Sequence, residues 1–181
     1  WESLFPLVDS LKNKYQVYSP NLPYPTKRIL ILDDYCQFVL DFIKKNNITK
    51  PILIGHSLGG AISTKIATDY PNIVSKIILM SAASIRHELP SHIKFFQKFS
   101  KILHPLRKPL LKLLNLDASD YIILKTDIEK QTFRNLIHAD QSKTLSSINT
   151  PTLILWGDND KSTPIADGQL INKLINNSTF K

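Results

Sequence analysis

The chain has 181 residues, of which 43% are hydrophobic and 21% charged, and its formal net charge is +8 at pH 7. These proportions are typical of one globular domain and exclude a fibrous or largely disordered chain. Its single cysteine, Cys36, excludes an internal disulfide framework and a zinc site built on paired cysteines. The sequence shows neither a signal peptide nor an apolar run of about 18 residues, so a cytoplasmic protein is expected.

Four short apolar runs predict strands. Three of them are aliphatic or β-branched and are flanked by turn residues, which is typical of strands buried on both faces of a parallel sheet. The fourth, nearest the start of the chain, ends at a Ser-Pro pair. In chain order the four runs are residues 15–18, 51–54, 77–80 and 152–156.

Helical periodicity separates these runs. One apolar stripe follows residues 32–43, and Asp33 and Asp34 stand in its first turn, where carboxylates suit the helix dipole. A second helix is expected over 58–70 and a third after the Thr-Pro pair at 163–164. Strands that alternate with helices predict an α/β fold, mainly a parallel sheet with helices on both faces.

Residues 85–147 break this alternation, since they are helical in pattern and interrupted by prolines. We therefore expect an inserted helical cap there, between residues 1–84 as the first part of the core and 148–181 as the second. The cap is also where basic residues gather. Between residues 85 and 112 they are Arg86, Lys94, Lys98, Lys101, Arg107, Lys108 and Lys112, against one acid, Glu88.

A basic helix face over the apolar stripe of Phe95, Phe96 and Phe99 has two interpretations. The simpler is a solvated face above a buried stripe, and the other is attraction to an anionic membrane surface or ligand. A nucleic-acid partner is not expected, because the sequence holds no Gly-rich RNA-binding motif, zinc finger or heptad-linked basic region.

The most informative motif is Gly-His-Ser-Leu-Gly-Gly, residues 55–60, which follows an apolar run and opens a predicted helix. Such a strand-to-helix turn pushes the oxygen of Ser57 out of the backbone, and we expect Gly55 and Gly59 to keep the crowded turn free of Cβ clashes. The helix N-terminus aims amide groups at an anion beside the serine, so the Leu58 N–H becomes an oxyanion donor. His56 should leave the turn in another direction and is not expected to act as the base.

These residues identify a resemblance to the α/β-hydrolase superfamily, specifically its cap-bearing serine hydrolases. GHSLGG resembles the nucleophile elbow of that family, and PTLILWGDNDKSTP, residues 151–164, resembles the segment that delivers the acid of its triad. The resemblance implies that Ser57 is the nucleophile and Asp160 the acid that orients a histidine. It also implies attack on an acyl carbonyl, with ester, thioester, amide and carbon–carbon bonds left open.

Other side chains compete for these roles. Asp158 is the rival acid, although the family spacing from Gly157 favours Asp160. Cys36 is interpreted as a core or half-buried helix residue. The remaining histidines are interpreted as surface or packing residues of the cap, with His138 the least implausible base among them; they are His87, His92, His104 and His138.

The chain departs from the family pattern at both ends. The histidine of the family follows the acid, yet no histidine follows Asp160 before Lys181, and the strand that supplies the second oxyanion donor should precede Trp1. We therefore expect an internal fragment, inactive alone, whose gene continues to a histidine roughly 25–30 residues after Asp160.

The function expected is that of a serine hydrolase that attacks a small, largely apolar acyl substrate through an acyl-enzyme at Ser57, with no metal and no organic cofactor. One rival is a non-catalytic relative that binds a small molecule in the same pocket. Another is a membrane-associated lipase, which depends on the basic cap helix alone.

Overall fold

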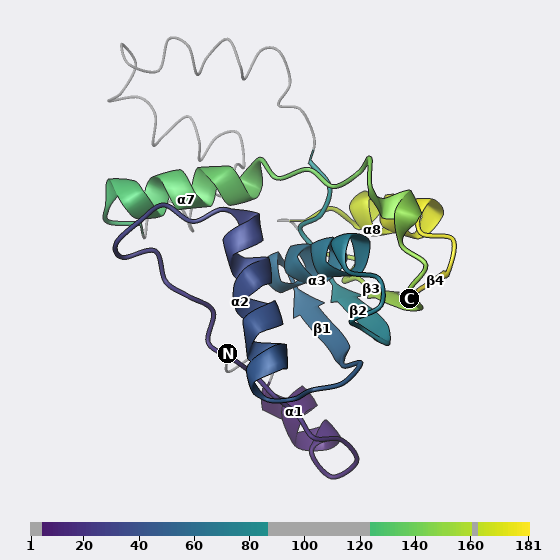
Figure 1. Ribbon diagram of the computed structural model, residues 1–181. Coiled ribbons are helices and arrows are strands. Elements are labelled where there is room, and N and C mark those ends of the chain that lie inside the picture. The colour runs from purple at the N-terminus through teal and green to yellow at the C-terminus, as the bar shows by residue number, and fades with distance from the viewer. Residues whose placement is uncertain (1–4, 87–123, 161–162) are drawn as a thin grey trace.

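Four parallel strands form one sheet in the order β1-β2-β3-β4 in the computed structural model, which describes residues 5–86, 124–160 and 163–181. Each strand pairs in parallel with the next, so crossovers carry the chain back after every strand, and the carboxyl ends meet at one edge (Figure 1). The strands are β1 (Ile52–His56), β2 (Lys76–Met80), β3 (Thr152–Leu155) and β4 (Ser178–Phe180).

Helices fill the connections. Figure 1 shows α3 running beside β1 and β2, and α2 beside α3. The helices are α1 (Phe5–Leu11), α2 (Leu32–Lys45), α3 (Leu58–Asp69), α7 (Asp127–Ile137) and α8 (Ile165–Leu174), with a short 3-10 turn η3 (Leu145–Ser147). No helix in the described ranges combines the length and the apolar character that crossing a membrane requires.

The start of α2 shows why this helix begins where its carboxylates predict. Asp34 accepts the N–H of Ile31 at 2.8 Å, which satisfies a backbone donor that has no partner within the helix. The Arg28 guanidinium donates to the other oxygen of Asp34 at 2.8 Å and holds the pKa of that carboxyl below its ordinary value. The predicted helix over 32–43 is therefore confirmed.

The core lies on one face of the sheet. Ile77 of β2, Ile154 of β3, Ile66 of α3 and Ile171 of α8 are fully buried in the same hydrophobic cluster, so α3 and α8 both pack on this face. Alternate residues of the strands point to the opposite face. There Ile52 and Ile54 of β1 are each 41% exposed, so the second layer of helices that the sequence predicts is not formed by α2, α3 or α8.

The predicted parallel α/β fold is confirmed, and three of the four predicted strands correspond to β1, β2 and β3 within two residues at each end. The strand predicted over 15–18 is wrong, because this segment is irregular and joins no described strand. The sequence also misses β4, whose three residues, Ser178–Phe180, are too few and too polar to show a strand pattern.

The predicted cap falls largely on residues 87–123, which lie outside the described residues, as do its basic helix and its phenylalanines. The segments before and after residues 87–123 are joined by hydrogen bonds. The N–H of Gln141 donates to the Ser84 carbonyl at 3.0 Å, and the N–H of Arg86 donates to Asp140 at 3.1 Å. The Arg86 guanidinium also donates to the Leu136 carbonyl at 3.1 Å. The segment after β2 is therefore hydrogen-bonded both to α7 and to the residues that follow it.

Candidate active site

Ser57 lies on the turn between β1 and α3, as its motif predicts. Its φ is 50° and its ψ −113°, a left-handed backbone that is costly for a residue with a Cβ. Bonds on both sides hold this conformation: its N–H donates to the Met80 carbonyl at 3.1 Å, and its carbonyl accepts the N–H of Ala83 at 3.0 Å. The serine stands at the amino-terminal cap of α3, yet its side chain makes no capping bond. The hydroxyl is therefore not committed to the helix.

The glycines around the turn have unequal roles. A Cβ on Gly55 would lie 2.2 Å from the carbonyl oxygen of Gly59, and a Cβ on Gly60 would lie 2.4 Å from the Cβ of Ala82. A Cβ on Gly59 would meet nothing within 4 Å. The prediction that Gly59 relieves a clash is therefore wrong, because Gly60 is the residue that lets α3 approach the segment after β2.

The first turn of α3 begins directly after Ser57. Leu58 is its first residue, so the Leu58 N–H has no partner within the helix and lies beside the serine. His56 is the last residue of β1 and is exposed. It alternates with Gly55, which faces the core, so the His56 side chain leaves toward the opposite face of the sheet.

The acid candidates lie in the loop after β3. Asp158 is exposed, whereas Asp160 is half-buried and bound at both carboxylate oxygens. The N–H of Thr163 donates to Oδ1 of Asp160 at 2.9 Å, and the hydroxyl of Thr163 donates to Oδ2 at 2.9 Å. The sequence indicates Thr163 only as part of a helix start and not as the partner of Asp160, although its place three residues after an aspartate is a recognisable turn signal.

Ser57 and Asp160 share one edge of the sheet. Ser57 follows β1 directly, and Asp160 lies in the loop that follows β3, with β2 between these strands. In open parallel sheets the crevice outside the carboxyl ends of the strands is where ligands bind. Ser81, directly after β2 at the same edge, also has a positive φ of 43°. A second strained residue at this edge was not predicted, and backbone strain of this kind gathers at functional sites.

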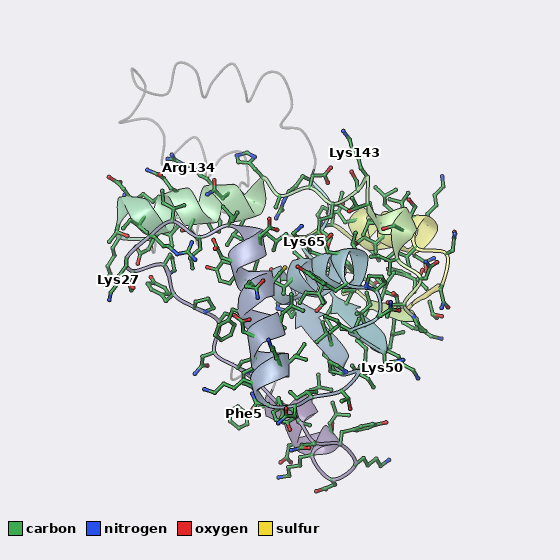
Figure 2. All side chains as sticks on the ribbon, in the orientation of Figure 1. Phe5, Lys27, Lys50, Lys65, Arg134 and Lys143 are labelled. Atoms are coloured by element: carbon green, nitrogen blue, oxygen red, sulfur yellow. The ribbon has the colours of Figure 1, made fainter. Side chains whose placement is uncertain are left out.

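The other nucleophile and base candidates lie elsewhere. Cys36 is 4% exposed, and burial raises the pKa of its thiol to about 12, which fits its interpretation as a core residue. His138 is exposed at the end of α7 and lines a groove of about 460 Å³ that does not include Ser57. Lys65 of α3, labelled in Figure 2, lines the same groove. Its ammonium group pairs with Asp33 at 3.0 Å.

Among residues 5–86, 124–160 and 163–181, no three histidine, cysteine or acidic side chains gather closely enough to hold a metal ion.

Comparison with known proteins identifies a family. A family model described as serine aminopeptidase, S33, matches residues 28–180. Among curated proteins, the chain is 23% identical to the uncharacterized hydrolase YugF of Bacillus subtilis (strain 168) over 96% of this chain and 74% of that protein. It is 24% identical to a 2-hydroxy-6-oxononadienedioate/2-hydroxy-6-oxononatrienedioate hydrolase of a Pseudomonas species, over 72% of this chain. The chain covers only 54% of that second relative.

Solved structures agree on the fold. A hydrolase from Pseudomonas aeruginosa PA01 superposes with a TM-score of 0.72 at 16% identity, over 99% of this chain and 76% of the other. A thermophilic esterase from Thermogutta terrifontis gives a TM-score of 0.67 at 16% identity, over 96% of this chain and 72% of the other. Both similarities indicate the α/β-hydrolase fold.

Proposed function

The chain belongs to the serine aminopeptidase, S33, family of α/β-hydrolases, and on this premise we propose that it is the core of a serine hydrolase acting on small acyl substrates. The observation that carries the proposal is the backbone of Ser57, held at a φ of 50° by bonds to Met80 and Ala83 while its hydroxyl makes no capping bond. A strained serine whose hydroxyl makes no capping bond is best explained by a reaction at its oxygen.

The proposed reaction is acyl transfer. The oxygen of Ser57 adds to the carbonyl carbon of the substrate, and its proton passes to a histidine outside the residues that the structure describes. The same histidine then protonates the leaving group, and Asp160 holds the imidazole in the orientation that both transfers require. The Leu58 N–H stabilises the negative charge that forms on the carbonyl oxygen, and water finally releases the acid and regenerates the serine.

Relatives support acyl chemistry but differ in the bond they cleave. Besides the hydrolase from Pseudomonas, they include a pimeloyl-[acyl-carrier protein] methyl ester esterase of Wigglesworthia glossinidia brevipalpis, 25% identical over 94% of this chain and 74% of that protein. We propose a carboxylic ester, a thioester or an activated carbon–carbon bond as the substrate. We also propose that the 181 residues alone are inactive, because a serine without an imidazole is a weak nucleophile.

Labelling with a fluorophosphonate tests the proposal in the complete protein. The probe should modify one residue, Ser57, and Ser57→Ala should abolish both labelling and ester hydrolysis while the unfolding temperature stays nearly unchanged. Ser75→Ala is the matched control, because Ser75 lies near the amino-terminal end of β2, where its hydroxyl donates to the Pro51 carbonyl at 3.2 Å. It should label like the wild type. Persistent labelling of the Ser57→Ala protein would refute the assignment, and a wild type that binds small acyl ligands without labelling would indicate a non-catalytic binding protein instead.

A further inference from the structure

The loop between β3 and α8 is closed by three hydrogen bonds to a single residue, Thr163. Its N–H and its hydroxyl each donate to a different carboxylate oxygen of Asp160, both at 2.9 Å. Its carbonyl accepts the indole N–H of Trp156 at 2.8 Å. Thr163 thus joins the proposed acid to Trp156, the first residue after β3.

We propose that Thr163 is a positioning residue for Asp160, and this inference depends on the proposed function of that carboxylate. A carboxylate held at one oxygen still rotates about its side-chain bonds. Two donors from the same residue, one for each oxygen, fix both the position and the plane of the group.

Thr163 is itself held by the framework. Trp156 packs against Gly168 of α8 so closely that a Cβ on Gly168 would lie 2.6 Å from the Cε3 atom of the indole. The same Cβ would lie 2.7 Å from Phe180 of β4. Because Gly168 has no side chain, the indole can lie against α8 close to Phe180. In this position its N–H donates to the Thr163 carbonyl. Hydrogen bonds through Thr163 and Trp156 therefore fix the position of Asp160 relative to the sheet.

A purely structural role for Thr163 predicts different behaviour from a positioning role. If the bonds only close the loop, their loss lowers stability and leaves the chemical step alone. If they orient Asp160, their loss lowers kcat with little change in KM, because the misplaced group acts in the transition state. The loss should also vanish once Asp160 has no carboxylate to orient.

Kinetics of the complete protein with p-nitrophenyl butyrate provide the test. Thr163→Val keeps the shape of the side chain and removes its donor, so kcat should fall about tenfold while KM changes less than about twofold. Thr163→Ser keeps the hydroxyl and should restore most of kcat. The matched control is Thr179→Val at an exposed position of β4, where the same chemical change should leave kcat unchanged.

The double variant Thr163→Val/Asp160→Asn should be no slower than Asp160→Asn alone. Trp156→Phe removes the N–H that holds the Thr163 carbonyl and should lower kcat about threefold, so it decides the matter if Thr163→Val does not fold. An unchanged kcat in Thr163→Val, an equal loss in the Asp160→Asn background, or no rescue by serine would each overturn the inference. If one of these outcomes occurs while Ser57→Ala abolishes hydrolysis in the same assay, only the inference about Thr163 is overturned. If Ser57→Ala remains active, the proposed function is overturned as well.

Discussion

Tyr24 donates its hydroxyl hydrogen to the carboxylate of Glu129, which lies 105 residues further along the chain. The N–H groups of Lys125 and Thr126 donate to the other oxygen of the same carboxylate, at 2.6 and 2.7 Å. One buried side chain therefore completes the amino-terminal cap of α7 and fastens the irregular segment before α2 to that helix.

These bonds make stability depend on pH. The hydrogen bond from Tyr24, followed by that from Thr126, lowers the pKa of Glu129 from 4.5 to about 2. Stabilisation by this carboxylate is therefore fully present above pH 4.5 and is lost as the pH falls toward 2. Glu129→Gln should reduce the free energy of unfolding near neutral pH, and its deficit relative to the wild type should shrink on acidification. Urea unfolding between pH 2 and 7 measures this, and Asp127→Asn, which removes a carboxylate at a position 90% exposed on the same helix, is the control variant.

The two glycines at the start of α3 should respond oppositely to alanine. Gly60→Ala forces a Cβ to within 2.4 Å of the Ala82 Cβ and should lower the free energy of unfolding. The expected loss is about 1–3 kcal/mol. Gly59→Ala meets open space and should leave stability unchanged or raise it by up to about 1 kcal/mol, since alanine favours a helix. Equal losses in denaturant unfolding would contradict the packing described here.

A buried hydroxyl pair links α3 to the segment after β2. Thr64 and Ser84 are both fully buried, and their hydroxyl oxygens are 3.0 Å apart. Thr64→Val leaves the Ser84 hydroxyl without this partner and should cost about 1–3 kcal/mol. The double variant Thr64→Val/Ser84→Ala should cost less than the sum of the two single changes, because it removes both polar groups together. Strict additivity in thermal unfolding would mean that the hydroxyls do not interact.

The two aspartates of the loop after β3 should be distinguishable by rate. Asp160→Asn should slow fluorophosphonate labelling of Ser57 in the complete protein by about 10³-fold or more, as expected when a triad loses its acid. Asp158→Asn alters an exposed carboxylate and should label at the wild-type rate. The reverse order of rates would transfer the role of the acid to Asp158.

Much of the fold could be predicted because β1, β2 and β3 are apolar runs, and because α2 and α3 have clear start or stop residues. Residues 15–18 also resemble a strand, but a strand forms only where a neighbour supplies hydrogen bonds, and the described sheet offers none there. The periodicity of α8 could not reveal that Gly168 makes room for Trp156, because that contact depends on where two elements meet in space.

The candidate site was predictable as a motif but not as a packing arrangement. The spacing around Ser57 indicates a strand-to-helix turn, and the structure has that turn. Gly60 is needed because of Ala82, a residue outside the motif. The motif alone indicates Gly59 instead, because Gly55 and Gly59 lie two residues either side of the serine. The family spacing favours Asp160 over Asp158. Its two hydrogen bonds to Thr163 could not be predicted, because they depend on the geometry of the loop, which spacing alone does not define.

The position of β1 has a practical consequence for handling the protein. β1 stands at one end of the strand order, so within the described sheet its outer edge has unpaired N–H and C=O groups, next to Ile52 and Ile54. A bare, uncharged edge of this kind recruits strands from other molecules. Concentrated solutions of these 181 residues should therefore form oligomers that grow by strand addition, and a lysine in place of Ile54 should keep them dispersed.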